Sequence, residues 1–216
     1  LGQFKLGATH STGLKNASLY ELYGNTGQRN IKPEKSETNE IIGEYNFSEN
    51  IKFSSTAYRT RMKDRIKIKS DWSAYENKVP DTTQEGLESQ INLSGKNQSL
   101  SLISHFAKSR TATGGPNSRR PDVSYGFDYS KKFNSSAYGP FDLNINHRFI
   151  GDHIDWTGSQ NAFVKSVDLV DMSIRKNWFG NIISLNFTNL LNERYEKPAT
   201  YSQDGRQISF KMINLF

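Results

Sequence analysis

The chain has 216 residues, a formal net charge of +6, no cysteine and a mean hydropathy of -0.72. These values exclude a disulfide-stapled scaffold and a thiolate-bound metal, and no apolar run approaches the roughly 18 residues of a membrane-spanning helix. The basic residues are spread along the chain apart from small groups within 59–69 and at 119–120, so no nucleic-acid partner is expected. A strand-like stretch at 3–9 follows Leu1 closely, which fits either a mature secreted protein or a piece of a longer chain.

Period-two alternation of apolar and polar residues is the dominant pattern, and it predicts strands because strand side chains point alternately to two faces. In Phe141 to Phe149, for example, the odd positions are apolar or histidine and the even positions are Asp, Asn or Arg. The predicted strands, about ten in all, are 3–9, 41–47, 51–58, 87–93, 100–106, 123–130, 141–149, 170–174, 183–188 and 207–216. Helical periodicity of comparable strength is absent, so we expect an all-β fold.

Short and long connections alternate along the whole chain. The short ones are 47–50, 94–97, 134–139 and 176–180. The long ones are 11–35, 62–81, 111–121, 152–161 and 192–203. Because successive antiparallel strands reverse direction, all short turns fall at one end of the sheet and all long loops at the other. This sorting, with strands of roughly ten residues, is typical of antiparallel transmembrane β-barrels.

A soluble β-sandwich binding module is the structural alternative, since its strands also alternate, with the polar face toward water. Connection lengths in such folds rarely sort by end, and the polar faces here carry Asp142, Arg148, Asp171, Arg175 and Lys211, which suit a water-filled lumen. Aromatic residues near the strand ends fit interfacial girdles, although Tyr and Trp are enriched in strands generally. The pattern favours the membrane barrel.

Three segments resemble TonB-dependent outer-membrane receptors. They are GLKNASLYELYG at 13–24 followed by NIKPEKS at 30–36 and Glu40, then FTNLLNERY at 187–195, and finally Gly205-Arg206 with the last strand to Phe216. Their order and spacing agree across essentially the whole chain. Within the family, the resemblance is greatest to cobalamin receptors and their siderophore-receptor relatives.

The resemblance implies a barrel of about 22 strands preceded by a plug domain that carries the TonB-contacting segment. Residues 1–216 would then be the C-terminal portion of the barrel, without the plug domain and the N-terminal strands, in the bacterial outer membrane. The implied function is TonB-energised uptake of a large, scarce nutrient such as cobalamin or a ferric siderophore. Terminal Phe216 resembles the signal for barrel assembly.

The same resemblance defines the expected partners and sites. The partners are outer-membrane lipid and lipopolysaccharide, the barrel-assembly machinery, the TonB system through the missing plug, and a large small-molecule ligand. Loop aromatic rings would stack on that ligand and loop arginines would meet its negative groups. The candidates, each also compatible with an ordinary exposed loop residue, are Trp72, Tyr75, Arg119, Arg120, Trp156, Tyr195 and Tyr201.

A small outer-membrane barrel enzyme, protease-like, is the functional alternative. Asp152, His153 and Asp155 lie together in one predicted long loop, the region where outer-membrane barrel proteases place Asp and His. No nucleophile motif accompanies them, and no run has the ligand spacing of a calcium loop. We therefore expect no catalytic residues, no metal and no cofactor. We also expect that the ten strands alone form no stable barrel, because unpaired edges in lipid are costly.

Overall fold

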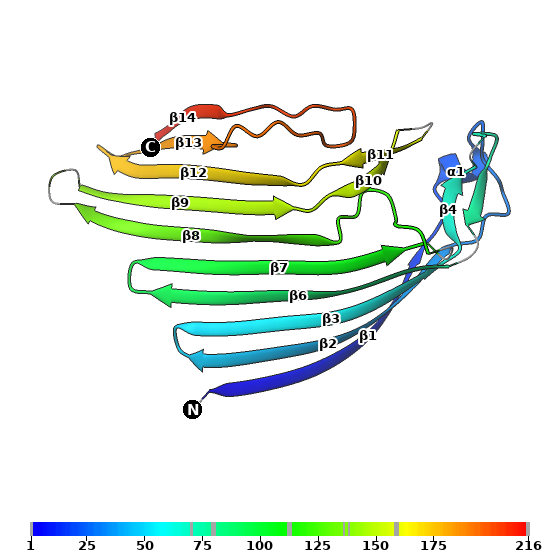
Figure 1. Cartoon of the computed structure of the whole chain (residues 1–216), viewed down its shortest axis with the longest axis horizontal. Coiled ribbons are helices and arrows are strands. Elements are labelled where there is room, and N and C mark those ends of the chain that lie inside the picture. Colours follow the sequence, from blue (N-terminus) through cyan, green and yellow to red (C-terminus); the bar gives the residue numbers. More distant parts are fainter. Residues whose placement is uncertain are drawn as a thin grey trace.

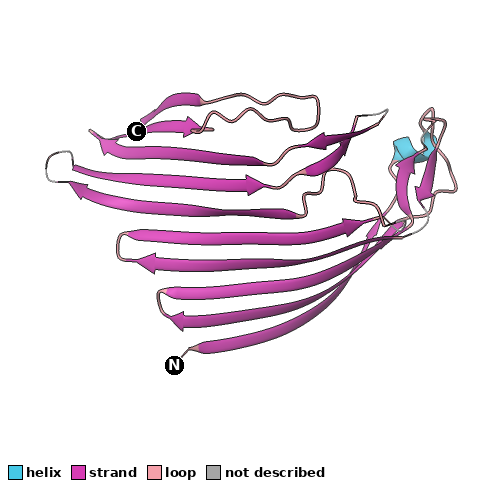
Figure 2. Ribbon diagram, in the orientation of Figure 1, coloured by secondary structure: helices cyan, strands magenta, loops and turns pink. Residues whose placement is uncertain are grey.

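The protein, described by a computed structural model over residues 2–69, 71–78, 81–111, 114–135, 137, 139–157 and 160–214, is built around one curved antiparallel sheet (Figure 1). Two small hairpins and a short helix lie in the connections between the strands (Figure 2). Among the described residues, no helix is both long enough and apolar enough to cross a membrane.

Ten strands form the main sheet and lie in chain order, each antiparallel to its neighbours. They are β1 (Gln3–Lys15), β2 (Glu34–Ser48), β3 (Ile51–Lys63), β6 (Thr82–Gly95), β7 (Gln98–Arg110), β8 (Val123–Ser135), β9 (Gly139–Ile150), β12 (Val167–Trp178), β13 (Asn181–Thr188) and β14 (Gln207–Asn214). The predicted all-β class and the predicted strands are confirmed. Most strands extend further than the alternating pattern indicated, and β1 continues to Lys15.

The small elements all lie in long connections. Helix α1 (Leu19–Tyr23) stands between β1 and β2. Strands β4 (Arg65–Ile68) and β5 (Tyr75–Lys78) pair between β3 and β6, and strands β10 (His153–Trp156) and β11 (Asn161–Val164) pair between β9 and β12. None of these elements was expected from the alternation.

Helix α1 begins at a reciprocal cap. The Glu21 amide donates to the Ser18 hydroxyl at 3.2 Å, and the Ser18 amide donates to the Glu21 carboxylate at 2.7 Å. This is the Ser-x-x-Glu capping box, which satisfies two amides that the first helical turn leaves without partners. A five-residue helix is too short to show helical periodicity, so the capping box was the one signal in the sequence that could have predicted it.

The connections sort by end as predicted. In Figure 1 the turns between β2 and β3, β6 and β7, β8 and β9, and β12 and β13 lie on the left, at what we call the short-turn end. The connections that contain α1, β4–β5 and β10–β11, together with 111–122 and 189–206, lie at the opposite, long-loop end. Strand direction alone therefore determines at which end of the sheet each loop lies.

Strand register gathers the apolar side chains on one face of the sheet. One row of directly paired residues crosses seven strands as Phe4, Tyr45, Phe53, Ile91, Leu102, Phe127 and His147. Many side chains on this outer face are well exposed, for example Phe4 at 64% and Phe210 at 65%. No second sheet of comparable size covers them within the described residues, as a β-sandwich would require. Lipid is the solvent that suits such a face.

The apolar band shifts along the strands from one side of the sheet to the other. On β1 its members are Phe4, Leu6 and Ala8, whereas on β14 they are Ile208, Phe210 and Met212. Following the pairs from Ile208 across the sheet leads to Ile51, the first residue of β3. The band on β14 therefore lies nearer the short-turn end than the band on β1. Strands tilted against a membrane require this displacement.

The few buried side chains among the described residues lie toward the long-loop end. The apolar ones are Ala74, Ala107, Val164, Val167, Leu169 and Ala199. They belong to the loop hairpins, to the ends of β7 and β12, and to the last long loop. Among the described residues, a water-excluding core thus exists only where the loops fold together.

We predict that residues 1–216 expressed alone in detergent form no monomeric, heat-modifiable barrel. Among the described residues, β1 pairs only with β2 and β14 only with β13, so each carries one edge of free backbone groups. Each such group costs several kcal/mol in lipid. Gel mobility before and after heating provides the measurement, with the full-length receptor as the positive control. A heat-modifiable monomer of the fragment would contradict the prediction.

Candidate functional site

The long-loop end is organised around one buried carboxylate, that of Asp155 on β10, whose side chain is 1% exposed. Its Oδ1 accepts hydrogen bonds from Arg119 Nε at 2.6 Å, the Trp156 amide at 2.7 Å and the Ser118 hydroxyl at 3.3 Å. Its Oδ2 accepts from the Ala199 amide at 2.9 Å. Asp155 therefore joins three connections: 111–122, the β10–β11 hairpin and 189–206.

The electrostatics of Asp155 follow from these contacts. Burial favours the neutral acid, but the hydrogen bonds from Ala199, Arg119 and Trp156 together outweigh it and lower the pKa of Asp155 from 3.8 to about 2. A buried carboxylate is stable only when its charge is compensated, and here the compensation comes from residues distant in sequence. The carboxylate accordingly positions loops and is not free to act as a base.

Two of the predicted ligand-binding residues lie together. The rings of Trp72 and Trp156 stack with centroids 6.2 Å apart and an interplanar angle of 24°. Trp72 is 54% exposed and Trp156 is 40% exposed, so both rings keep free surface. The Trp156 amide donates to Asp155, so the tryptophan pair is attached to the contacts by which Asp155 joins three connections, which we call the three-loop junction. The stack also draws the β4–β5 connection toward the other loops.

Tyr75 is placed by a different set of contacts. Its ring packs edge-on against Tyr20 of α1, with the ring centroids 6.2 Å apart, and its backbone amide donates to the Thr26 carbonyl at 2.8 Å.

Asn77, two residues after Tyr75, exchanges two 2.8 Å hydrogen bonds with the backbone of Lys32 and donates a third to the Asp64 carbonyl. The α1 connection and the β4–β5 hairpin therefore form one substructure, held by an asparagine that the sequence analysis did not single out.

Among the described residues, none of the remaining candidates makes a ring or cation–π contact with the tryptophan pair. Arg119 is committed to Asp155, and Arg120 is exposed beside it. Tyr201 is 65% exposed, and Tyr195 lines a hollow of about 490 Å³ with Arg194 and Gln203 in the 189–206 loop. Phe216, the expected assembly signal, lies outside the described residues. The ligand-binding roles of Arg119, Arg120, Tyr195 and Tyr201 stay predictions.

Asn189 explains the shape of the last long loop. It is 3% exposed, has a left-handed φ of 51°, and exchanges two 2.9 Å hydrogen bonds with the Glu193 backbone. Its own amide donates to Asp171 at 2.9 Å. Asparagine tolerates this conformation better than most residues, and its side chain closes the turn through the backbone four residues on. The resemblance at 187–195 thus coincides with a structural requirement.

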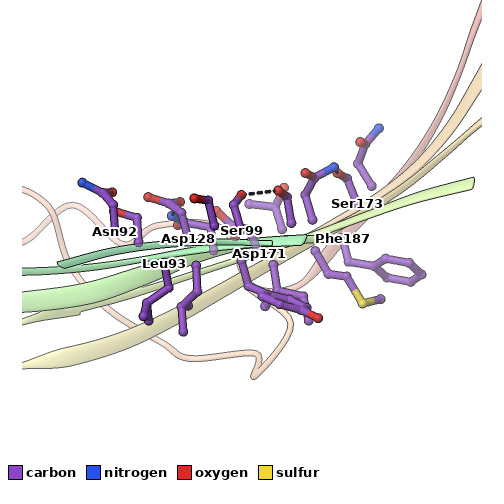
Figure 3. A pocket seen from close by; sticks show the side chains of 18 residues that line it. Asn92, Leu93, Ser99, Asp128, Asp171, Ser173 and Phe187 are labelled. Atoms are coloured by element: carbon purple, nitrogen blue, oxygen red, sulfur yellow. Dashed lines mark hydrogen bonds between the residues drawn. The ribbon is translucent and has the colours of Figure 1, made fainter. Parts of the chain in front are cut away.

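The inner face of the sheet is concave and polar. A hollow of about 470 Å³ lies on the wall. Figure 3 shows the residues that line it, with Asn92, Asp128, Ser99 and Ser173 on one side of the ribbon and Leu93 and Phe187 on the other. Ser99 and Ser130 hydrogen-bond across strands at 2.7 Å, and Arg148 lies 3.4 Å from Asp171. Such a surface suits a water-filled lumen and not contact with lipid.

Two residues of the enzyme alternative are engaged in contacts within their own loops or with neighbouring loops. Asp155 has both oxygens occupied, and His153 Nδ1 lies 3.2 Å from the Gly151 carbonyl, the acceptor that it would donate to. Within the part of the chain that the structure describes, no three His, Cys, Asp or Glu side chains lie close enough to hold a metal ion.

The curved wall, the lipid-suited outer face and the gathered long loops define a portion of a large outer-membrane β-barrel. The chain belongs to the TonB-dependent receptor family, since the family model described as "TonB dependent receptor-like, beta-barrel" matches residues 3–190. Members of this family lie in the outer membrane of Gram-negative bacteria, so the predicted family and location are confirmed.

Particular relatives agree with this assignment. The chain is 24% identical over 208 residues to the vitamin B12 transporter BtuB of Vibrio cholerae, covering 92% of this chain and 33% of the transporter. The structure matches the Pseudomonas aeruginosa ferripyoverdine receptor with a TM-score of 0.76 at 14% identity, over 97% of this chain and 30% of that one. It matches the Acinetobacter baumannii siderophore receptor PirA with a TM-score of 0.77 at 16% identity, over 95% and 38%. The chain thus spans about a third of these proteins.

We predict that Asp155→Asn in the full-length receptor accelerates tryptic cleavage after Arg119 or Arg194 roughly tenfold or more. The depressed pKa corresponds to about 2 kcal/mol of loop stabilisation at neutral pH, which the amide cannot supply. Asp152→Asn, at an exposed neighbouring position, is the matched control and should leave cleavage unchanged. Equal cleavage rates for the two variants would contradict the junction described above.

We predict a matching pH dependence in the unmodified receptor. Because the folded pKa of Asp155 lies below its unfolded value, its stabilisation is fully present above about pH 4 and is lost as the pH falls toward 2. Amide hydrogen exchange at Ala199 and Trp156, corrected for the intrinsic pH effect, should lose protection in this range. Protection that persists unchanged down to pH 2 would contradict the assignment.

Proposed function

We propose that this chain is part of a receptor for TonB-energised uptake of a large, scarce nutrient such as cobalamin or a ferric siderophore. One observation carries the proposal: three long loops are tied together by Asp155 at the same end of a polar, concave wall. A receptor needs loops that present one shared surface above its lumen. A pre-organised surface also loses less conformational entropy when a large ligand binds.

The chemistry of that surface suits a large ligand with flat and negatively charged parts. The exposed faces of Trp72 and Trp156 offer stacking area, and Tyr75, Tyr195 and Tyr201 add aromatic groups on neighbouring loops. Arg120 and Arg194 supply positive charge, whereas the charge of Arg119 is paired with Asp155. The vitamin B12 transporter and the ferripyoverdine receptor among the relatives support both ligand classes, cobalamin and ferric siderophores.

The mechanical parts of uptake are proposed at the level of the family. We infer that residues 1–216 form the C-terminal portion of the barrel and that a plug domain, elsewhere in the full protein, contacts the TonB system. The coverage of about a third of each relative supports this division. Insertion would depend on the barrel-assembly machinery, for which terminal Phe216 is the proposed signal. The protein is not proposed to be an enzyme, because no described contact favours a catalytic role.

We predict that Trp72→Ala and Trp156→Ala in the full-length receptor each weaken nutrient binding about tenfold, since one stacked aromatic contact contributes on the order of 1 kcal/mol or more. The measurement is titration of the purified receptor with cobalamin and with a panel of ferric siderophores. Trp178→Ala is the matched control, because Trp178 is 51% exposed but lies at the short-turn end.

The outcomes separate the site from the function. Binding that is lost with Trp72 and Trp156 but kept with Trp178 supports both. Binding that is unchanged in all three variants contradicts the site while leaving the receptor function intact. No binding of any cobalamin or siderophore by the unmodified full-length receptor contradicts the function.

A further inference from the structure

A groove of about 350 Å³ opens on the outer face of the sheet, at the long-loop end of β1, β2 and β3. The side chains along it are Thr12, Leu14, Lys35, Glu37, Arg61 and Lys63. They alternate in step with the apolar band, because Lys35 and Glu37 share a face with Ile41, and Arg61 and Lys63 share a face with Ala57. The groove therefore faces away from the lumen.

The groove contains an excess of positive charge that the fold does not compensate. Lys35 on β2 pairs directly with Lys63 on β3, and like charges directly opposite each other are destabilising. Neither lysine forms an ion pair with any of the described residues. Two carboxylates compensate Arg61 instead, since Glu37 is its direct cross-strand partner and Asp81 is bound to it at 2.7 Å. An anion between the two lysines would relieve their repulsion.

The height of the groove relative to the apolar band indicates what kind of anion fits. Lys63 follows Ala57 by six residues on the same strand, which is about 20 Å along the strand and about 15 Å along the membrane normal for a tilted strand. Ile41, which pairs with Ala57, is 59% exposed and marks the upper part of the band. The groove thus lies at headgroup level, directly above a surface suited to acyl chains.

A second row of charges lies between the band and the groove. Arg59, Glu85 and Lys108 follow one another across β3, β6 and β7 as direct pairs, and all three are exposed. Both ends of this row are cationic. Together with the groove it extends the positive surface across neighbouring strands, one step nearer the apolar band.

We propose that this outer groove binds a phosphate group of lipopolysaccharide, with Lys35 and Lys63 as its cationic ligands. A doubly charged phosphate matches the two lysine ammonium groups in charge and in hydrogen-bond donors. The occupant has to be a lipid and not a soluble nutrient, because the groove shares its face with the apolar band and not with the lumen. The proposal rests on the outer-membrane location of the family and is independent of which nutrient is transported.

The test compares lipopolysaccharide binding by the full-length receptor and by a Lys35→Gln/Lys63→Gln variant in detergent, measured by native mass spectrometry. We expect lipopolysaccharide binding by the Gln variant to be about tenfold weaker or more, because the variant loses two charge-assisted contacts. Lys5→Gln/Lys52→Gln is the matched control, since it removes two lysines from the opposite face of β1 and β3. Lys35→Arg/Lys63→Arg should retain binding, and heat modifiability verifies that every variant is folded.

Two probes distinguish a lipid from free phosphate. Dephosphorylated lipopolysaccharide should bind the unmodified receptor about as weakly as lipopolysaccharide binds the Gln variant, and inorganic phosphate alone should compete poorly. Equal lipopolysaccharide binding by the Lys35→Gln/Lys63→Gln and Lys5→Gln/Lys52→Gln variants would overturn the site. Inorganic phosphate binding as tightly as the lipid would overturn the assignment of the occupant.

Discussion

The whole wall depends on one constraint, namely that backbone amides and carbonyls in lipid have to pair within the protein. The antiparallel ladder from β1 to β14 meets it in the interior of the sheet. Because the ladder fixes which residues lie side by side, it also assembles apolar side chains from all ten strands into one surface. The outer face, the lumen face and the separation of loops from turns all follow from this register.

The long-loop end obeys a different constraint, because water reaches it. There the chain builds a small core of residues such as Val164, Val167 and Leu169 and compensates one buried charge, that of Asp155. Arg119 and Ala199, which provide that compensation, come from connections that the wall holds at the same end. The wall thus determines which loops can meet, and the junction determines how they meet.

The strands of the wall could be predicted from sequence, because lipid on one face and water on the other impose strict alternation of apolar and polar residues. The predicted strand 141–149, for example, corresponds to β9. The continuation of β1 to Lys15 was missed, since beyond the membrane the ladder persists without a contrast between faces. The stacking of Trp72 on Trp156 and the burial of Asp155 depend on loops distant in sequence. No local sequence pattern predicts contacts between loops that are distant in sequence. Asp155 in particular resembles any polar loop residue until Arg119 and Ala199 surround it.

The confinement of the buried core to the long-loop end has a consequence for how the molecule loses its structure. The wall is stabilised by an amphiphilic solvent, whereas the loop junction is stabilised by exclusion of water and by a compensated charge. Detergent exchange acts on the first region, and acid or chaotropes in the aqueous phase act on the second. The protein therefore consists of two regions whose stability depends on different media. The loop junction can unfold while the strands of the barrel wall remain folded.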